Sequence, residues 1–218
     1  MTDPLLHAWD ISKHYGGIDA LKRVSLEVHP GEVVALMGEN GAGKSTMAKI
    51  IAGVERPDSG VIEWAGQEVH FRDTRDATAA GIAIVLQELS LVPDLSVAEN
   101  VFLAHRSAYR GGWWLNRAAV NQGTLDLAAR LGWDFPLDPT RKVSDLTLAE
   151  QQMVEILRAL SLDARLVILD EPTASLSPHE VDVLFSLVRR LQARGTAFLI
   201  VTHRLEEVFA LADRITVY

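Results

Sequence analysis

The 218-residue chain contains no cysteine. Disulfide frameworks and thiolate metal sites are therefore excluded, and a reducing compartment is compatible with the sequence. No stretch approaches the roughly 18 apolar residues of a membrane-spanning helix. The first ten residues, MTDPLLHAWD, have an acid where a secretory signal needs lysine or arginine, and no apolar stretch of useful length follows. We therefore expect a soluble, cytosolic protein.

Basic residues are outnumbered, with 21 Lys and Arg against 29 Asp and Glu and a formal net charge of -8. Proteins that bind nucleic acid usually carry a basic face, so this balance argues against such a partner, although a local basic patch remains compatible with it. The hydrophobic share of 48% suits one globular domain with enough apolar surface for a core.

Short apolar runs recur along the chain at 33–37 (VVALM), 82–86 (IAIVL), 166–169 (LVIL) and 197–201 (AFLIV). None alternates polar with apolar residues, so each predicts a strand covered on both faces, as in parallel sheets. Helical patterns fall between these runs, at 45–53, 179–193 and 204–212. The order of elements predicts an α/β fold.

The stretch from about 90 to 162 differs from the rest of the chain. It lacks a strand-like run, and Val120, Leu127 and Leu131 show helical spacing. Turn signals interrupt it at 111–112 and 134–139. We predict a helical subdomain inserted into a core formed by residues 1–89 and 163–218.

Each predicted strand is followed by polar residues. They are the glycine-rich segment GENGAGKST after the first run, Gln87 after the second, Asp170 and Glu171 after the third, and Thr202 and His203 after the fourth. Open parallel sheets bind ligands beyond the carboxyl ends of their strands. We therefore expect these groups to converge on one edge.

The segment 38–45 matches the phosphate-binding pattern G-x-x-x-x-G-K-[ST] between a strand and a helix. Its backbone N–H groups and the helix amino end would hold phosphates, the Lys44 ammonium would reach the β- and γ-phosphates, and the Ser45 hydroxyl would ligate Mg²⁺. The alternative is a glycine-rich turn with a surface lysine. The predicted nucleotide-binding residues here are Gly38, Glu39, Asn40, Gly41, Ala42, Gly43, Lys44, Ser45 and Thr46.

Four more side chains complete the predicted chemistry. Asp170 is placed to hold Mg²⁺ through water, and Glu171 to act as general base, unless the pair is only an acidic turn before Pro172. Gln87 would bridge Mg²⁺ and the attacking water, and His203 would donate to the γ-phosphate, although either residue alone is more often a satisfied loop residue.

Tyr15, which we place before the first strand, would stack on adenine; the alternative is an aromatic anchor for its loop.

Together these residues, in this order, resemble the nucleotide-binding domain of ABC transporters over essentially the whole chain. The resemblance implies a P-loop NTPase core with a mainly parallel sheet, amino-terminal antiparallel strands and an inserted helical subdomain. It also implies ATP hydrolysis with Mg²⁺. The segments QELSLVPDLSVAENVFL (87–103) and EQQMVEILRAL (150–160) are more narrowly similar to importers of monosaccharides such as ribose, galactose, arabinose or xylose.

In that family a signature, typically L-S-G-G-Q, caps a helix that reaches the γ-phosphate on a partner domain. Here it is LTLAE (146–150): Thr147 keeps the hydroxyl, Leu148 and Ala149 replace both glycines, and Glu150 replaces glutamine. A leucine side chain obstructs close backbone approach to a phosphate, and Glu150 is spaced to bond back to Thr147 in a reciprocal cap. We therefore predict a poor catalytic half-site beside a good phosphate loop.

The resemblance also implies partners: a second nucleotide-binding domain, a membrane permease and, indirectly, a periplasmic sugar-binding protein, with this chain peripheral on the cytoplasmic side of the inner membrane. Residues 88–103 would receive the permease. The apolar side chains of 101–105 and Trp113–Trp114 would either contact it or belong to the core. Because such ATPases usually hold two domains, we expect the first half of a longer protein, ending at RITVY (214–218). Alternatives are a nucleotide-binding switch, a soluble ABC ATPase of translation or repair, and a P-loop kinase.

Overall fold

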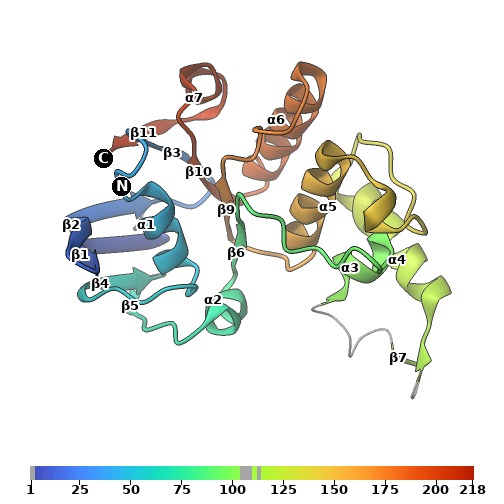
Figure 1. The fold of residues 1–218 in the computed structure, drawn as a ribbon, viewed down its shortest axis with the longest axis horizontal. Helices are drawn as coiled ribbons and strands as arrows, with labels where there is room; N and C mark the ends of the chain where they lie inside the picture. Colours follow the sequence, from blue (N-terminus) through green and yellow to red (C-terminus); the bar gives the residue numbers. More distant parts are fainter. Residues whose placement is uncertain (1–2, 104–109, 112–113) are drawn as a thin grey trace. The chain divides into compact units, whose positions relative to one another are not determined.

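The structure is a computed structural model that describes residues 3–103, 110–111 and 114–218. It divides into two compact units (Figure 1). The first comprises Met1–Ile84, Ala164–Glu171 and Arg189–Tyr218, and the second comprises Val85–Asp163 and Pro172–Val188.

A five-stranded sheet lies at the centre of the first unit. Its strands stand in the order β11-β3-β10-β9-β6, and β10 pairs parallel with β3 and β9, as β11 does with β3. Their bounds are Val33–Met37 for β3, Ile82–Val85 for β6, Leu166–Asp170 for β9, Ala197–Val201 for β10 and Arg214–Val217 for β11. All five residues of β9 and of β10 are buried, which confirms the prediction of strands covered on both faces.

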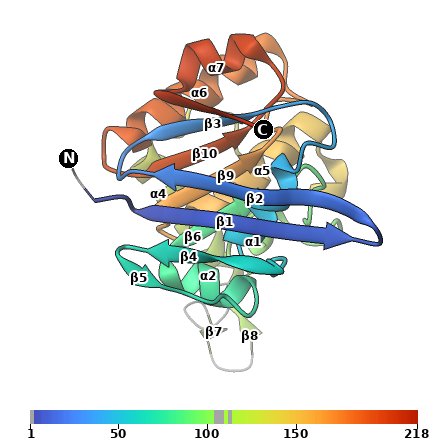
Figure 2. The ribbon, with the colours of Figure 1, turned by 90° about the vertical axis from the view of Figure 1, so that its left-hand side faces the viewer.

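A second, antiparallel sheet belongs to the same unit, with strand order β2-β1-β4-β5 (Figure 2). The strands are β1 (Leu6–Tyr15), β2 (Ile18–Val28), β4 (Ser59–Trp64) and β5 (Gln67–Glu68). The predicted fold class, a parallel P-loop core with amino-terminal antiparallel strands, is thereby confirmed. Tyr15 is the last residue of β1, so placing it before the first strand was wrong.

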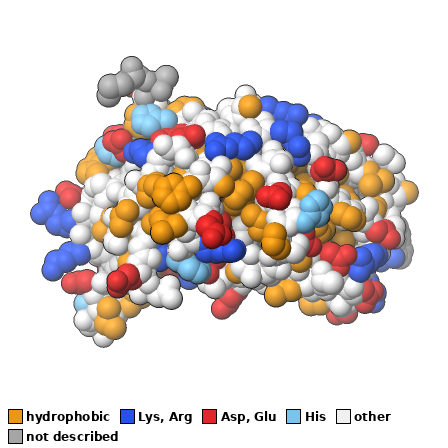
Figure 3. All heavy atoms as spheres, turned by 90° about the horizontal axis from the view of Figure 1, so that it is seen from above, with side chains coloured by type: hydrophobic (Ala, Val, Ile, Leu, Met, Phe, Trp, Pro, Cys, Tyr) orange, Lys and Arg blue, Asp and Glu red, His pale blue; other side chains and the backbone are white. Residues whose placement is uncertain are grey.

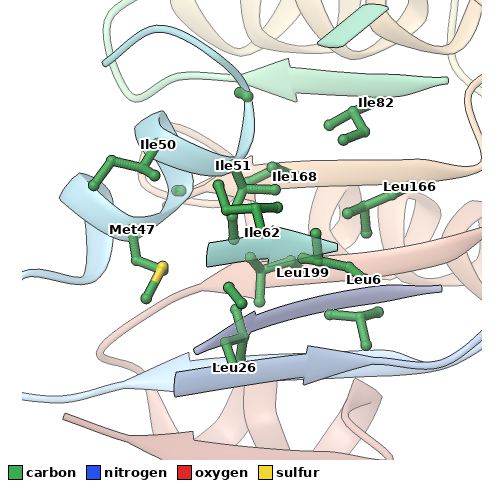
Figure 4. Close-up of a cluster of buried hydrophobic side chains, with 14 of the residues drawn as sticks. Leu6, Leu26, Met47, Ile50, Ile51, Ile62, Ile82, Leu166, Ile168 and Leu199 are labelled. Carbon is green, nitrogen blue, oxygen red and sulfur yellow. The ribbon is translucent and has the colours of Figure 1, made fainter. Parts of the chain in front are cut away.

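Helix α1 (Lys44–Ile51) is held between the sheets by its apolar residues. Met47, Ile50 and Ile51 are almost fully buried and meet Leu26 of β2 and Leu199 of β10 in one cluster (Figure 4). Burying an aliphatic side chain of this size contributes roughly 1.5–3 kcal/mol. The residue that opens α1, Lys44, therefore sits on a helix anchored by the core.

Three further helices follow, of which the sequence patterns predicted two. They are α2 (Thr74–Ala80), capped by Asp73, α6 (Pro178–Gln192), which passes from the second unit into the first, and α7 (Leu205–Leu211). The patterns at 179–193 and 204–212 predicted α6 and α7 to within one residue at each end.

The second unit is mainly helical. Its helices are α3 (Val97–Val101), α4 (Arg117–Leu131) and α5 (Leu148–Leu160), with a 3-10 turn at Val143–Asp145. Val120, Leu127 and Leu131 are buried, as their helical spacing predicts. The same stretch contains a two-stranded antiparallel sheet of β7 (Arg110–Gly111) and β8 (Trp114–Leu115), which the absence of a strand-like run did not predict.

Polar groups fasten the segment after β6 to the helices of the second unit. The fully buried Asn100 accepts from the Val92 N–H at 2.7 Å and donates to the Val92 and Ser96 carbonyls, both at 3.0 Å. Ser90 donates to the buried Glu155 carboxylate at 2.8 Å. Because a buried polar group must be hydrogen-bonded, these contacts fix the segment to α3 and α5.

The surface carries mixed charge. On the face in Figure 3, Lys and Arg side chains are interspersed with Asp, Glu and hydrophobic ones. Leu205 and Phe209, both on α7, are 58% and 77% exposed. Within the described ranges, no helix combines the length and apolar character that a membrane span requires.

Candidate functional site

The glycine-rich loop joins β3 to α1 in the first unit. The Ala42 N–H donates to the Glu39 carbonyl at 3.1 Å, which closes a turn. Gly43 precedes the helix with φ +88°, and a Cβ atom there would lie 2.2 Å from the Ala20 carbonyl oxygen of β2. Only glycine fits, and the close approach ties the loop to the antiparallel sheet.

Lys44 is the first residue of α1 and is 6% exposed. Its Nζ donates to the carbonyls of Gly38 at 2.9 Å and Glu39 at 2.8 Å, so the ammonium lies within the curve of the loop. A buried ammonium is tolerated because it is hydrogen-bonded. Together with the unpaired N–H groups that begin a helix, this charge makes the loop suitable for an anion.

Ser45 and Asp170 connect the loop to β9. The Ser45 hydroxyl donates to Oδ1 of Asp170 at 3.1 Å, and Asp170 is only 3% exposed. Burial raises the pKa of Asp170 above its usual value, and the donated hydrogen bond from Ser45 opposes that shift.

Hydroxyl and carboxylate oxygens are ligands that Mg²⁺ accepts, so Ser45 and Asp170 fit a magnesium site. In the part of the chain that the structure describes, no three His, Cys, Asp or Glu residues form a metal site by themselves. An ion held by Ser45 and Asp170 would take its other ligands from phosphate and water.

Glu171 and His203 form a second pair at the same edge. Nδ1 of His203 lies 3.0 Å from Oε1 of Glu171, and the Glu171 N–H donates to the Val201 carbonyl of β10 at 2.9 Å. Glu171 has φ +48°, a left-handed conformation that costs a non-glycine residue about 1–3 kcal/mol. The strain is retained because β10 fixes the amide, and it aims the carboxylate at the imidazole.

These contacts form one continuous set of residues. Ser45 contacts Asp170, Asp170 precedes Glu171, Glu171 contacts His203, and Lys44 adjoins Ser45. They come from the ends of β3, β9 and β10, which are neighbours in the sheet. Of the residues predicted to converge, those of the first unit do so.

Tyr15 also belongs to the first unit. Its side chain is 43% exposed, and Nζ of Lys13 lies 5.4 Å from the ring centroid. A half-exposed aromatic ring is compatible with stacking on a base. Its contact with adenine stays a prediction.

Gln87 is exposed and follows β6 by two residues in the second unit. Its role with Mg²⁺ stays a prediction.

The signature residues form a closed cap on α5. The Glu150 N–H donates to Oγ1 of Thr147 at 3.2 Å, and the Thr147 N–H donates to Oε2 of Glu150 at 2.7 Å. Arg141 donates to Oε1 of Glu150 at 2.7 Å. These bonds, the one from the Thr147 N–H foremost, lower the pKa of Glu150. The expected reciprocal cap is confirmed, with Leu148 60% exposed beside it and Ala149 partly buried.

Glu207 is a residue near the site that the sequence patterns did not single out. It is 6% exposed in the first turn of α7, and Thr202 donates to it at 2.8 Å. An acid placed two residues into a short helix usually faces solvent, so only the fold reveals its burial.

The fold and the site together define a P-loop nucleotide-binding cassette. A family model described as ABC transporter matches residues 21–174. The chain therefore belongs to the ABC transporter family.

Its relatives include ribose import ATP-binding proteins RbsA. The protein from Rhodococcus jostii is 47% identical over 98% of this chain and 42% of its own length, and one from Streptomyces avermitilis is 49% identical with the same coverage. The chain thus spans less than half the length of these relatives.

Solved structures agree with this assignment. A nucleotide-free ATP-binding cassette from an ABC transporter superposes with a TM-score of 0.85 at 26% identity, covering 99% of this chain and 87% of that one. A dimeric bacterial ABC transporter cassette superposes with a TM-score of 0.83 at 27% identity, covering 97% and 93%.

Proposed function

We propose that this chain is an ATP-binding and ATP-hydrolysing domain that energises import of a monosaccharide. The observation that supports this most is the set of contacts Ser45–Asp170 and Glu171–His203 beside the buried ammonium of Lys44. A phosphate grip, a metal-ligand pair and a base with an imidazole partner are the parts that phosphoryl transfer to water requires.

Each residue has a distinct task in this proposal. The loop amides and Lys44 bind the phosphates, and Ser45 with Asp170 would hold Mg²⁺, which neutralises charge on the phosphate oxygens when bound. Glu171 accepts a proton from the attacking water, and His203 donates to the γ-phosphate and holds the water in line. Gln87 would contact both metal and water, and Tyr15 would stack on adenine.

The proposed partners are a second nucleotide-binding domain and an integral membrane permease, with a periplasmic sugar-binding protein acting through the permease. Relatives named for ribose import support a transport role, and the dimeric cassette structure supports a second domain. We propose accordingly that the chain lies peripherally at the cytoplasmic face of the inner membrane.

The proposed permease contact lies at 88–103, where α3 begins with a Ser96–Glu99 capping box. Of the predicted apolar contacts, residues 104–105 and Trp113 lie outside the described residues.

The capped signature supports a division of labour between two domains. Leu148 stands where a phosphate would need close backbone approach, and the Glu150 carboxylate is engaged by Thr147 and Arg141. We therefore propose that the signature of a second domain completes the site on this chain. The coverage of 42% of the relatives' length is compatible with two such domains in one protein.

A second candidate is a nucleotide-binding switch with little hydrolysis, which the closed cap at Thr147 and Glu150 favours. Replacing Glu171 by Gln in the full chain distinguishes the two. We expect ATP affinity to be retained and turnover to fall by about 100-fold or more, because the proton acceptor is lost. Unchanged turnover would favour the switch, and Lys44→Ala, expected to lose ATP affinity, is the control for binding.

The sugar would be identified with the native complex. The complex would be isolated from membranes and mixed with binding proteins that carry ribose, galactose, arabinose or xylose. One of these sugar-loaded binding proteins should stimulate its ATP hydrolysis. A complex that no sugar-loaded binding protein stimulates would contradict monosaccharide import while leaving ATP hydrolysis standing.

A further inference from the structure

The imidazole of His203 stands on a short loop between β10 and α7. Its side chain is 56% exposed, so little packing restrains it. The contact with Glu171 at 3.0 Å therefore depends on the backbone of Thr202, His203 and Arg204. Helix α7 has seven residues and no side-chain hydrogen bond from its N-cap, so the helix alone does not fix that backbone.

Both neighbours of His203 are tied to Glu207. Before it, the Thr202 hydroxyl donates to Oε2 of Glu207 at 2.8 Å. After it, the Arg204 guanidinium lies 3.0 Å from Oε1 of Glu207, and the Arg204 N–H donates to the Thr202 hydroxyl oxygen at 3.1 Å. The three residues close a ring of contacts around His203.

Burial makes the Thr202–Glu207 side of this ring stiff. Thr202 is 2% exposed and Glu207 6%, and a hydrogen bond between groups excluded from water is not easily exchanged for one to solvent, whereas the Arg204 side chain is 47% exposed. The Glu207 carboxylate tolerates burial because each of its oxygens has a partner. Thr202 also donates its N–H to the Leu36 carbonyl at 3.4 Å, which connects this ring of contacts to β3.

We propose that Glu207 is a positioning residue that acts through Thr202 and Arg204 to hold His203 against Glu171. Glu207 has no proposed contact with nucleotide. The proposal rests on the proposed hydrolytic function, because it assigns a purpose to the placement of His203 within that site.

The test is a double-mutant cycle on turnover in the full chain, with Glu207→Ala and His203→Ala alone and combined. Displacing a catalytic group by about an ångström costs up to about 100-fold in rate, so we expect Glu207→Ala to lower kcat by about 10-fold or more. In the His203→Ala background the same change should lower kcat less than twofold, because its target is gone.

Three measurements separate positioning from loss of structure. The KM for ATP should change by less than about threefold, because the phosphate loop is untouched. Glu206→Gln, a change of equal charge at the exposed neighbouring position, should keep kcat within about twofold. Glu207→Gln, which keeps an acceptor for Thr202, should recover part of the rate and serves if Glu207→Ala does not fold.

The outcomes distinguish the two proposals. Equal losses from Glu207→Ala in both backgrounds would overturn the positioning role. If His203→Ala leaves the turnover of an otherwise wild-type chain unchanged, the proposed function is overturned instead. In that case a crystal structure of Glu207→Ala decides the inference, since an unchanged His203–Glu171 distance would refute it.

Discussion

Ser45 and Asp170 are 125 residues apart in the sequence, yet the Ser45 hydroxyl donates to the Asp170 carboxylate at 3.1 Å. Ser45 is the second residue of the helix after β3, and Asp170 is the last residue of β9. β10 separates these strands in the sheet, so the contact spans two strand spacings at the carboxyl edge. It joins the phosphate loop to the proposed metal ligand.

Replacing Asp170 by Asn should abolish most of the Mg²⁺-dependent hydrolysis. The amide keeps an acceptor for Ser45 but loses the charge that attracts the cation, so we expect kcat to fall by about 100-fold or more. ATP affinity measured with and without Mg²⁺ should become similar in the variant. Asp134→Asn, at an exposed position, is the matched control. An undiminished magnesium dependence would remove Asp170 from the metal site.

Gly43 should be far less replaceable than Gly41, although their φ angles are nearly equal, at +88° and +86°. Alanine at 43 would place Cβ 2.2 Å from the Ala20 carbonyl oxygen, whereas alanine at 41 meets nothing within 4 Å. We expect Gly41→Ala to cost about 1–2 kcal/mol of unfolding free energy from backbone strain alone. Gly43→Ala should cost about 3 kcal/mol or more. Urea unfolding of both variants measures the difference, and equal losses would contradict it.

Parts of the fold that depend on local sequence signals could be predicted, whereas parts that depend on contacts between distant residues could not. The strand at 33–37 and the phosphate loop were predictable because an unbroken apolar run and a glycine-rich segment are local signals. β1 was not located because its alternation breaks at bulges between Ala8 and Ile11, where Asp10 adopts φ +54°. Strands of two residues, such as β7, show no periodicity at all.

The site divides in the same way. The residue types that end each strand predicted Asp170, Glu171 and His203, because parallel strands bring their ends to one edge. The ring of Glu207 with Thr202 and Arg204 was not predictable, since it depends on α7 turning an acid inward. The left-handed backbone of Glu171 likewise depends on β10 holding its amide.

Restoring both signature glycines tests the proposed division of labour. In Leu148→Gly/Ala149→Gly the cap between Thr147 and Glu150 remains, and two glycines in the first turn should cost about 1–2 kcal/mol of helix stability. We expect ATP hydrolysis by the assembled complex to stay within about twofold or to rise, because this signature contributes little. A large loss in rate, with thermal unfolding showing a folded protein, would contradict the proposal.

Glu150 should make the free energy of unfolding of the chain depend on pH in the acidic range. The Thr147 N–H and then Arg141 lower its pKa in the folded state below the ordinary 4.5, so its contribution is present above pH 4.5 and is lost as pH falls through the lower folded value. Glu150→Gln keeps the cap geometry but not the charge. We expect it to be less stable than the wild type by about 0.5 kcal/mol at pH 7.

That difference should shrink as pH falls below 4.5, because protonation then removes the same charge from the wild type. Urea unfolding from pH 7 to pH 3 measures it. Arg141→Ala supplies the control: it removes the guanidinium but leaves the hydrogen bond from the Thr147 N–H, which is the larger cause of the lowered pKa. The pH dependence of the free energy of unfolding should therefore weaken in Arg141→Ala and weaken more strongly in Glu150→Gln. A difference between wild type and Glu150→Gln that stays constant across this range would mean that the charge of Glu150 contributes nothing to the cap.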